Sequence, residues 1–555
     1  MIELNFIKLI EGALKDNWSL PIFTNYGEGE TYTAADVAKY VAKVHLMLSS
    51  TGVERGDKVV LVAKDSAEWC MVWVGIVTYG CVVVPILPDF HADNIRNIIH
   101  HSDAKVVYVG KEHIKYLDTE AMPGVKAVFT VKDLTPISSL TSHPISSTLD
   151  ANKLFNNQYP NGFDRSHIQY PEISNDTLMV ISYTSGTSGF SKGVMTTANN
   201  LAANIKVTLS FEQFERGKSI LSFIPNAHAY GCAFNFLLSM IVGCHVYILG
   251  AKPVPRLLLK AFKEVRPHMI LTVPLVLEKI YKNVIVPKID KPAIKLALKI
   301  PGLNSIIYRK IGTALKEALG GNVKGVIIGG AALNREVDEF LSKAKFPYTV
   351  GYGMTECAPL MAYSVKSEFV VGSCGKVLDM IEEVRIYEPR EDNGLMVGEV
   401  QVRGENVCKG YYKEPKLTEE LFTADGWMRT GDLGYLDKSN NLFLRGRSKS
   451  MILGPNGQNI YPEEIEAKIA MLPYMSEAIV VPRSDTSIVA IVTLDKVTLK
   501  QDGKDNDEAI KEILKENKVA LNQSLSSFAA ISNFEVLDGE FQKTPKQSIK
   551  RYLYE

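Results

Sequence analysis

The chain has 555 residues, 46% of them hydrophobic and 22% charged, which is typical of a soluble globular protein and long enough for several compact units. Lysine plus arginine and aspartate plus glutamate balance at 62 each, so nothing global argues for nucleic acid or an anionic membrane as a partner. The seven cysteines are scattered and never form a CxxC pair, which indicates reduced cytoplasmic thiols and not a disulfide framework or a zinc site.

The first half of the chain alternates helical and strand patterns. Helices are expected over residues 34–50 and from Trp69 onward. The expected strands are 58–62, 82–84, 104–109, 178–181, 220–224, 246–249, 269–273 and 326–328. Strands that alternate with helices predict parallel sheets covered on both faces, with ligands at the carboxyl ends of the strands. Residues 130–175 are rich in Ser, Asn, Pro and Asp and are expected to form a long irregular connection.

Residues 69–88 form an apolar run that is about long enough to span a bilayer. Gly80 interrupts the run, and the β-branched residues 82–84 favour a buried strand over a continued helix. We therefore expect a buried helix that turns into a buried strand, and the same arrangement at 234–249. The N-terminus lacks the basic region and long apolar core of a signal peptide. The sequence thus predicts no transmembrane segment and a cytoplasmic location, with peripheral membrane association left open.

The segment 183–194, Tyr-Thr-Ser-Gly-Thr-Ser-Gly-Phe-Ser-Lys-Gly-Val, follows one of the expected strands. Its glycines permit a tight turn whose backbone N–H groups converge on an anion, and its hydroxyls add donors for phosphate oxygens. Lys192 supplies a positive charge within reach of the same phosphates. The spacing differs from a Walker A loop, because Ser191 and Gly193 stand where that pattern needs Gly and Ser or Thr. We predict a polyphosphate site, with a flexible surface loop as the alternative.

Two further motifs place carboxylates on tight turns. Residues 351–356, Gly-Tyr-Gly-Met-Thr-Glu, combine glycines that allow close approach to a flat ligand with Glu356. Glu356 is a candidate Mg²⁺ ligand, since nucleotide-bound Mg²⁺ usually takes one or two protein carboxylates. In residues 426–432, Asp432 is suited to accept paired hydrogen bonds from ribose hydroxyls. Ordinary turns are the alternative for both motifs.

After about residue 380 the pattern changes to short strands separated by Gly-rich turns, expected at 383–387, 399–403, 434–437 and 441–444. A polar linker with Arg, Ser and Lys at 446–450 then leads into a stretch with its own pattern. Helices are expected there at 462–470 and 507–521, and strands at 478–481 and 488–493. This pattern indicates a small α+β domain joined through the linker.

Taken together, these motifs resemble the adenylate-forming superfamily of acyl-CoA synthetases, luciferases and peptide-synthetase adenylation domains, over nearly the whole chain. The resemblance implies an α/β fold. A large N-terminal domain of parallel, helix-covered sheets with a small β subdomain would span residues 1–446, and a small mobile α+β domain would span residues 447–555. The small domain would swing about a hinge at Lys449. The runs 329–333 and 456–466 are most similar to medium- and long-chain fatty acyl-CoA synthetases.

The same resemblance implies roles for individual residues. The ATP-binding residues would be Thr184, Ser185, Gly186, Thr187, Ser188, Gly189, Lys192, Gly330, Ala331, Gly351, Tyr352, Gly353, Met354, Thr355, Asp432, Leu444 and Arg447. Glu356 with Thr184 would hold Mg²⁺. His228, Gly231 and Gly330 would line the acyl pocket, although a core histidine is the alternative for His228. The expected catalytic residues are Lys192, Glu356, Arg447 and Lys546.

One departure from the superfamily concerns residues 543–551, Lys-Thr-Pro-Lys-Gln-Ser-Ile-Lys-Arg. Ser548 stands where the superfamily carries a Lys that bridges the substrate carboxylate and the α-phosphate. In an extended segment Lys546 and Lys550 would point to the same side as residue 548, about 7 Å along the strand. Lys546 is therefore the predicted replacement, provided that the loop shifts.

The implied activity is ATP-dependent conversion of a carboxylic acid, expected to be a fatty acid, to acyl-AMP, followed by thioester formation with coenzyme A. ATP, Mg²⁺ and coenzyme A are the expected cofactors, and no nucleic acid partner is expected. One alternative is an adenylating enzyme that passes acyl groups to a carrier protein. Another is a nucleotide- or acyl-binding relative whose adenylation is impaired through Ser548. Neither the acyl chain length nor the oligomeric state follows from the sequence.

Overall fold

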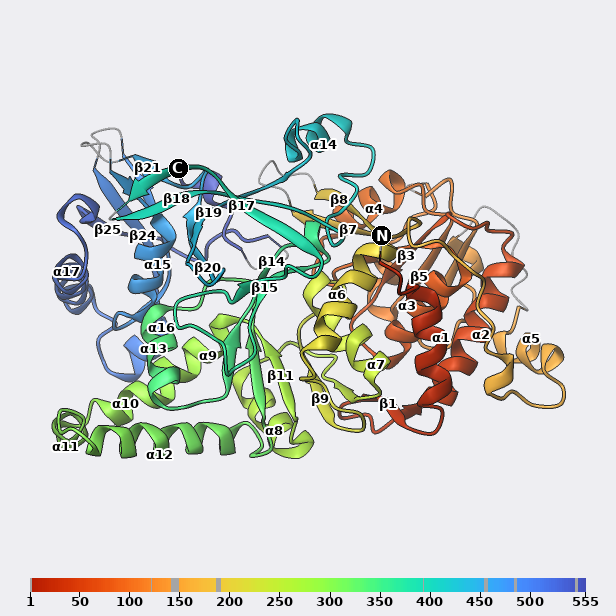
Figure 1. The fold of residues 1–555 in the computed structure, drawn as a ribbon, viewed down its shortest axis with the longest axis horizontal. Coiled ribbons are helices and arrows are strands. Elements are labelled where there is room, and N and C mark those ends of the chain that lie inside the picture. Colours follow the sequence, from red (N-terminus) through yellow and green to blue (C-terminus); the bar gives the residue numbers. More distant parts are fainter. Residues whose placement is uncertain are drawn as a thin grey trace.

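The computed structural model describes residues 2–120, 122–140, 149–185, 191–392, 394–453, 458–483, 487–544 and 548–555, and only the backbone of residues 185 and 191. Two large sheets with their helices occupy most of the molecule (Figure 1). Antiparallel strands β17–β19 lie above them in this view, and the C-terminal domain is at the upper left. This layered arrangement confirms the predicted α/β fold class.

The two large sheets are mostly parallel. In spatial order the first contains β6 (Ala127–Thr130), β5 (Val106–Val109), β3 (Lys58–Val62), β4 (Val82–Ile86), β7 (Leu178–Ser185) and β8 (Ser191–Thr197). The second contains β13 (Tyr348–Val350), β12 (Gly325–Ile328), β11 (Met269–Thr272), β9 (Ser219–Ser222), β10 (His245–Ile248), β1 (Pro21–Asn25) and β2 (Thr31–Thr33). The edge pairs β7–β8 and β1–β2 are antiparallel. The inner strands are buried, as expected of parallel sheets covered by helices.

Helices cover both sheets of the N-terminal part. They are α1 (Phe6–Asp16), α2 (Ala34–Ser50), α3 (Ala67–Tyr79), α4 (Ala92–His101), α5 (Ala151–Gln158), α6 (Ala198–Ser210), the π-helix η4 (Gly231–Leu238), α7 (Ser239–Val242), α8 (Pro255–Val265), α9 (Pro274–Ile280), the π-helix η5 (Tyr281–Ile285), α10 (Val286–Ile289), α11 (Pro292–Ala297), α12 (Leu303–Ala318) and α13 (Arg335–Lys343).

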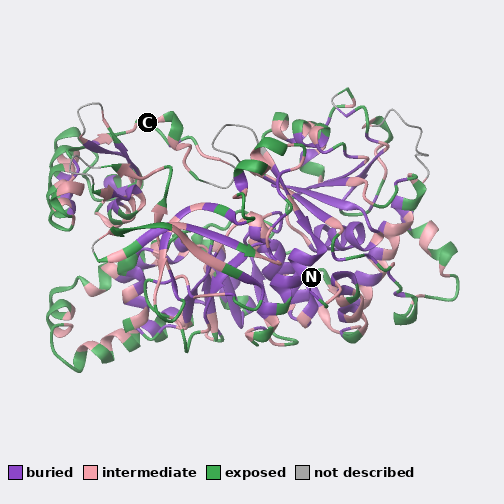
Figure 2. Ribbon diagram, turned by 45° about the horizontal axis from the view of Figure 1, so that its top comes forward, coloured by how far each residue is buried: buried purple, intermediate pink, exposed green. Residues whose placement is uncertain are grey.

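Helix α3 is buried on all sides, which explains why its sequence is apolar throughout. Its N-terminus is capped by Ser66, whose side chain accepts from the backbone N–H of Trp69, and it ends at Gly80 in the left-handed conformation (φ 99°). A Cβ on Gly75 would lie 2.6 Å from Val44 Cγ1, so α2 and α3 pack closely at this point. Buried residues concentrate in the centre of the molecule (Figure 2). The predicted helix, turn and buried strand at 69–88 is confirmed.

The same arrangement recurs in the second sheet, as expected. The π-helix η4 runs into α7, which ends at Gly243 in the left-handed conformation (φ 84°) before β10 begins. In a π-helix each backbone N–H bonds to the carbonyl five residues earlier, instead of four as in an α-helix. Such segments are rare and are frequently found at functional sites. A Cβ on Gly231 would lie 2.4 Å from the carbonyl oxygen of Pro225, so the first turn of η4 packs directly on the preceding loop.

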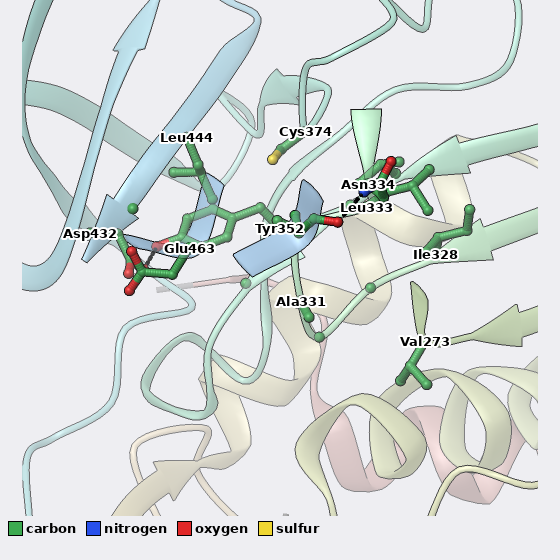
Figure 3. Close-up of a pocket in the computed structure, with 18 of the residues that line it drawn as sticks. Val273, Ile328, Ala331, Leu333, Asn334, Tyr352, Cys374, Asp432, Leu444 and Glu463 are labelled. Carbon is green, nitrogen blue, oxygen red and sulfur yellow. Dashed lines mark hydrogen bonds between the residues drawn. The ribbon is translucent and has the colours of Figure 1, made fainter. Parts of the chain in front are cut away.

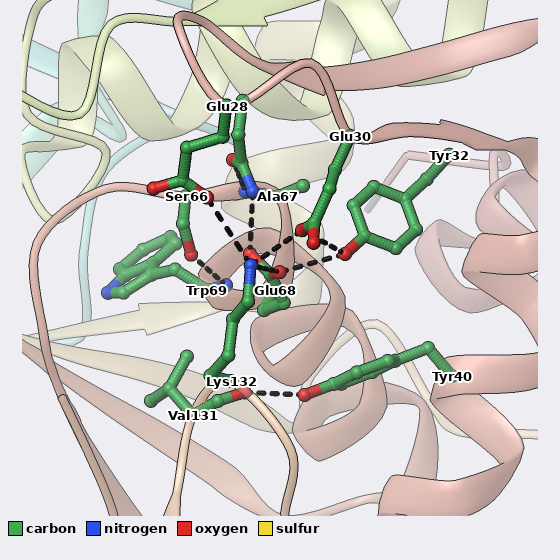
Figure 4. A network of polar contacts seen from close by, with 11 residues as sticks. Glu28, Glu30, Tyr32, Tyr40, Ser66, Ala67, Glu68, Trp69, Val131 and Lys132 are labelled. Carbon is green, nitrogen blue, oxygen red and sulfur yellow. Dashed lines mark hydrogen bonds and ion pairs between the residues drawn. The ribbon is translucent and has the colours of Figure 1, made fainter. Parts of the chain in front are cut away.

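An ion-pair network around the buried Glu68 connects the edge of the second sheet to α3 (Figure 4). Glu68 is 1% exposed and accepts hydrogen bonds from Asn25 Nδ2 at 3.0 Å and from Tyr32 OH at 2.8 Å. The Lys132 ammonium lies 2.9 Å from Glu68 and 2.5 Å from Glu30. Burial opposes ionisation of Glu68, but the hydrogen bond from Lys132 and the bonds from its other partners outweigh it and lower its pKa. The charge is buried but paired, as buried charges must be.

The remaining elements form smaller antiparallel units. Beyond β13 the chain forms β14 (Tyr352–Gly353), β15 (Leu360–Tyr363), β16 (Lys376–Val377), β17 (Glu382–Asp392), β18 (Leu395–Gly404), α14 (Pro415–Leu421), β19 (Met428–Leu436) and β20 (Leu442–Arg447). The C-terminal domain contains β21 (Ile452–Leu453), β22 (Asn459–Ile460), α15 (Pro462–Met471), β23 (Met475–Pro482), β24 (Ile488–Leu494), α16 (Lys496–Gln501), α17 (Asp507–Gln523) and β25 (Asn533–Val536). Its buried residues form clusters separate from the main core, which is expected of an independent folding unit.

The expectation that residues 130–175 form an irregular connection throughout is wrong in part. Helix α5 lies within them, and its first turn is capped by Asp150, which accepts from two backbone N–H groups. The strand β6, which ends at Thr130, was also not predicted. Among the described residues, no helix is both long and apolar enough to cross a membrane.

Candidate active site

The first part of the site lies where β7 and β8 meet. Thr184 on β7 is paired in the sheet with Lys192 on β8. The predicted phosphate-binding residues Gly186, Thr187, Ser188 and Gly189 lie outside the described residues. The Lys192 ammonium lies 5.0 Å from the centre of the Tyr411 ring. A cation above an aromatic face at this distance is attracted by the ring. Tyr411 therefore fixes the direction in which Lys192 points.

Tyr411 also connects Lys192 to Glu356. Its hydroxyl donates to Glu356 Oε1 at 2.9 Å. Burial and the charge of Glu356 raise the pKa of Tyr411, so the phenol keeps its proton and remains a donor. The position of the ring is set by the backbone, because Tyr411 forms a β-bridge with Val194 and the N–H of Tyr412 donates to Gly193 at 2.8 Å. The chain thus brings an ammonium and a carboxylate to one tyrosine.

Glu356 and Thr184 line the same cavity, as a metal site shared between them would require. One carboxylate and one hydroxyl are a suitable donor set for Mg²⁺, which binds nucleotide phosphates with few protein ligands. The described residues contain no group of three His, Cys, Asp or Glu side chains that could hold a metal ion. The chemistry of these donors therefore fits an ion that is held largely by the nucleotide phosphates.

The second part of the site is built around Asp432 on β19. The Asp432 carboxylate is 7% exposed, accepts from the Tyr352 hydroxyl and lies 2.8 Å from Arg447 Nε (Figure 3). Burial raises the pKa of Asp432, while Arg447 opposes this shift. Leu444 lies beside Tyr352 in the same view. The tyrosine ring, the carboxylate and the guanidinium form a polar end of the cavity suited to an aromatic base and a ribose.

The loop 351–356 supplies most of the wall between these two parts. Gly351, Tyr352, Gly353, Met354, Thr355 and Glu356 all line the cavity. A Cβ on Gly353 would lie 2.0 Å from the carbonyl oxygen of Pro359, so glycine is needed there by the neighbouring backbone. The close approach that we expected at this glycine is therefore made by the chain itself. Asn204 fastens the same loop by donating to the carbonyl of Cys357 and accepting from the N–H of Leu360.

The third part of the site is apolar. Its wall includes Phe211, Phe214, Ile224, Tyr230, Phe234, Leu271, Val273, Ile327, Ile328 and Leu333. His228, Gly330 and Ala331 also line the cavity, whereas Gly231 does not, so the structure gives Gly231 no place in the pocket. Thr184 and Glu356, the polar end at Asp432 and the apolar wall line one continuous cavity of about 1810 Å³, whereas Lys192 and Tyr411 lie beside it, next to Glu356. This volume exceeds that of a pocket for one small ligand, which is commonly about 300–1,000 Å³.

The C-terminal domain closes the polar end of the cavity. Lys449, Glu463, Ser548 and Lys550 line it, and Lys546 lies outside the described residues. The Thr544 N–H donates to the Ser548 carbonyl at 2.8 Å. Two flanking cations bind elsewhere in the C-terminal domain. Lys543 lies 2.8 Å from Glu477, and Arg551 pairs with Glu466.

Two side chains of the N-terminal part hold helix α15 of the C-terminal domain. The Lys282 ammonium donates to the carbonyls of Ala470 and Met475 at 2.7 and 2.6 Å. Asn334 Nδ2 donates to the carbonyl of Ala467 at 2.6 Å. A cation at the C-terminus of a helix satisfies carbonyls that have no partner within the helix. Burial lowers the pKa of Lys282 to about 8. Lys282 and Asn334 therefore fix this orientation of the C-terminal domain.

The family profile of AMP-binding enzymes matches residues 13–412, and that of the AMP-binding enzyme C-terminal domain matches residues 449–555. The chain belongs to the AMP-binding enzyme family. The long-chain-fatty-acid–CoA ligase FadD15 of Mycobacterium bovis is 27% identical over 498 residues, which cover 83% of this chain and 77% of that protein. The 4-coumarate–CoA ligase of Vanilla planifolia is 28% identical and covers 84% and 79% of the two chains.

The structure of ATP-bound MatB from Rhodopseudomonas palustris shares this fold, with a TM-score of 0.76 at 21% identity over 99% of this chain and 98% of that chain. The predicted membership of the adenylate-forming superfamily is thus confirmed for this AMP-binding enzyme. Three residues of the site were not predicted from the sequence: Tyr411, Asn334 and Lys282. Each lies in a segment without a distinctive motif, and only the fold brings it to the cavity or to the C-terminal domain.

Proposed function

We propose that this AMP-binding enzyme is an ATP-dependent acyl-CoA ligase that activates a fatty acid as acyl-AMP and transfers the acyl group to coenzyme A. The observation that carries the proposal is the single cavity lined by Glu356, by Asp432 with Arg447 and by a long apolar wall, with Tyr411 and Lys192 directly beside Glu356. The relatives named above act on a long-chain fatty acid and on 4-coumarate, so both support a CoA ligase. The aliphatic and aromatic wall favours a fatty acid as substrate.

The proposed first step is attack of the substrate carboxylate on the α-phosphate of ATP, with release of pyrophosphate. Attack of one anion on another is promoted by positive charge and aligned donors. Lys192 would neutralise the phosphates, and Tyr411 would hold both Lys192 and Glu356 in place. Mg²⁺, held through Glu356 and Thr184, would supply further positive charge at the phosphates. Asp432 would bind the ribose hydroxyls, and Arg447 would keep Asp432 ionised in its buried position.

The proposed second step is attack of the coenzyme A thiol on the acyl carbonyl, with release of AMP. We infer that the domain of residues 447–555 turns about Lys449 between the steps. In the orientation described here Ser548 and Lys550 line the cavity, which supports assigning this orientation to the first step. Closure by a domain also excludes water from the reactive acyl adenylate.

The scattered cysteines, six of them buried, support a cytoplasmic location.

The proposal is tested by measuring pyrophosphate release from the purified protein with MgATP, coenzyme A and saturated fatty acids of increasing length. Release that depends on the acid and rises with coenzyme A would support the ligase. A product that forms only with a phosphopantetheinylated carrier protein would support acyl transfer to a carrier. If no acid leads to pyrophosphate release, while ATP still raises the melting temperature of the protein, the result would support an adenylation-impaired relative and overturn the proposal.

Enlarging Ala331 should shorten the acids that the enzyme accepts. Ala331 is exposed to the cavity beside Ile328 and Val273, so the Ala331→Leu side chain would occupy space that a long acyl chain needs (Figure 3). Overpacking of this size costs about 1–3 kcal/mol, so we expect KM for the longest acids to rise about 10-fold or more. Steady-state kinetics over the chain-length series measures this. The KM of Ala331→Leu for short acids should be unchanged. The control Ala424→Leu, on an exposed turn, should keep the wild-type KM for every acid. An equal rise in KM for all acids would contradict the placement of Ala331 at the acyl chain.

Removing the Lys282 ammonium should weaken the first step selectively. In Lys282→Met the carbonyls of Ala470, near the end of α15, and of Met475, at the start of β23, lose their donor, so the orientation that brings Ser548 to the cavity becomes less populated. Each part-buried carbonyl left without its donor costs about 1–3 kcal/mol, so adenylation should slow about 10-fold or more. Thioester formation from supplied acyl adenylate should not slow. The exposed Lys279→Met is the matched control. Equal slowing of both partial reactions would contradict the assignment.

Docking of the C-terminal domain through Lys282 should also become more favourable as the pH rises. Burial lowers the Lys282 pKa to about 8 in this orientation, whereas an exposed lysine titrates near 10.5. The docked orientation therefore binds fewer protons than the undocked one between these two values, so raising the pH from about 8 to about 10 favours docking. Resonance energy transfer between dyes on the two domains should report a rising docked fraction over that range. Lys282→Met should abolish this pH dependence.

A further inference from the structure

We propose that residues 275–310, here called the amphipathic arm, form a surface that binds anionic lipid bilayers. The arm comprises α9 after its first residue, η5, α10, α11 and the first half of α12. It forms the lower left edge of the molecule in Figure 1, away from the two large sheets. Most of its residues beyond 282 are exposed or half-buried.

Exposed aliphatic side chains concentrate on the arm. Among the residues that the structure describes, seventeen large hydrophobic residues are exposed, and six of them lie within residues 275–306 of the 555-residue chain. They are Leu275, Val284, Leu296, Ile300, Leu303 and Ile306, with exposed fractions between 38% and 66%. Scattered exposed apolar residues are normal, but a cluster of them indicates an interaction surface.

Basic side chains are interleaved with these aliphatic ones. Residues 288–310 contain six exposed cations, namely Lys288, Lys291, Lys295, Lys299, Arg309 and Lys310. Asp290 is the single acidic residue of this stretch, and it lies 3.1 Å from Lys295. The chain as a whole has balanced charge, so this excess is local.

The packing of α12 forces its apolar residues outward. A Cβ on Gly312 would lie 2.3 Å from the carbonyl oxygen of Ala344, so this side of α12 is held against the end of α13. Leu303, Ile306 and Lys310 follow the spacing of one helix face, and Gly312 lies about half a turn away from Leu303. Leu303 and Ile306 therefore cannot turn inward without breaking the contact at Gly312, and Lys310 stands on the same outer face.

An anionic bilayer fits this surface better than a second protein chain. Aliphatic side chains enter the boundary between headgroups and acyl chains, while interleaved lysines bind anionic headgroups. Lysine is depleted at the centre of protein interfaces, and two copies of the arm facing each other would bring twelve cations together. Nucleic acid would leave the six aliphatic side chains without an apolar partner. The combination of aliphatic and basic side chains on the arm therefore favours an anionic lipid bilayer over a protein or a nucleic acid as its partner.

The arm is connected to the wall of the cavity through α13. Tyr281 of η5 and Tyr308 of α12 pack on Phe340, with ring centres 5.0 and 5.8 Å apart. Tyr281 also donates to Glu336, which lines the cavity, at 2.8 Å. Tyr281 of the arm thus contacts a residue of the cavity wall directly. Given the proposed function, this would place the pocket next to a bilayer in which fatty acids dissolve.

Vesicle flotation with the full-length protein tests the proposal. The probes are vesicles of phosphatidylcholine alone and of phosphatidylcholine with phosphatidylglycerol. We expect binding to the anionic vesicles that falls with salt, and at least ~10-fold weaker binding of Leu296→Asp/Ile300→Asp and of Lys295→Glu/Lys299→Glu. The control Val497→Asp/Val519→Asp alters two exposed valines, 68% and 52% exposed, on α16 and α17. This control should bind as the wild type does.

Absence of wild-type binding to anionic vesicles would overturn the proposal, as would equal loss in the arm and control variants. Self-association that disappears in Leu296→Asp/Ile300→Asp, without vesicle binding, would instead identify a second copy as the occupant. The charge variant changes only exposed side chains, so it keeps the test valid if the apolar variant fails to fold. Vesicle flotation measures binding without catalysis. Its result can therefore be interpreted even if the protein lacks the proposed ligase activity. Turnover of a short, water-soluble acid should be unchanged in both arm variants.

Discussion

Replacement of Ser548 by Lys is expected to raise acid-dependent pyrophosphate release by about 10²–10³-fold, the usual effect of one charged or hydrogen-bonding group aimed at a transition state. Ser548 lines the polar end of the cavity, and its carbonyl accepts a hydrogen bond from the Thr544 N–H. Lys543 and Arg551 are engaged by Glu477 and Glu466 and are unavailable. A new ammonium at position 548 would therefore meet the substrate carboxylate and the α-phosphate.

The measurement is single-turnover pyrophosphate release, compared with thioester formation from supplied acyl adenylate. The second reaction should change little, because the small domain would have turned away. Ser548→Met controls for the length of the side chain without its charge. Lys550→Met asks whether Lys550, which also lines the cavity, already supplies the charge. If Lys550→Met abolishes release and Ser548→Lys adds nothing, the idea of a missing charge is wrong.

Replacement of Lys192 by Met is expected to lower the rate of pyrophosphate release by about 10²–10³-fold, because one cation opposite the phosphates is lost. Lys192 is held over Tyr411, which in turn donates to Glu356, so its ammonium has a fixed direction. A cation that acts on the transition state affects kcat, whereas one that only binds ATP affects the KM for ATP. Steady-state kinetics with ATP as the varied substrate separates the two.

Two variants calibrate this result. Lys206→Met removes an exposed lysine of α6 and should leave the kinetics unchanged. Tyr411→Phe keeps the aromatic ring below Lys192 but removes the donor to Glu356, so its loss should be smaller than that of Lys192→Met. A Lys192→Met enzyme with normal kcat would show that the ammonium does not act on the reacting phosphates.

Local patterns were sufficient for most of the fold. The limits of α2 and β3 agree with the sequence-based expectation, because a capping residue and a run of β-branched residues mark them. Helix α5 was missed because its polar sequence lacks apolar periodicity and its formation depends on the Asp150 cap. Short polar helices of this kind leave little trace in the sequence.

The site divides in a similar way. Asp432, Arg447, Glu356 and Thr184 lie in or next to motifs with a chemical reason, and all four line one cavity. Tyr411 and Lys282 have no such motif, and their positions depend on long-range pairing that no local pattern contains. Gly353 has a further structural reason to be glycine that its motif does not contain, since a Cβ there would collide with the carbonyl of Pro359. Lys546 and the phosphate turn lie outside the described residues, so these predictions stand as made.

The π-helix η4 suggests how the acid specificity of such an enzyme could change in evolution. Phe234 within η4 and Tyr230 just before it line the cavity, while the end of η4 continues into α7 and is fixed by β10. Loss of one codon within η4 would convert the segment to an α-helix and rotate the preceding residues by about 100° relative to the core. Different side chains would then face the acyl chain. A single insertion or deletion would therefore exchange several side chains of the cavity wall in one mutational event, which no single substitution can do.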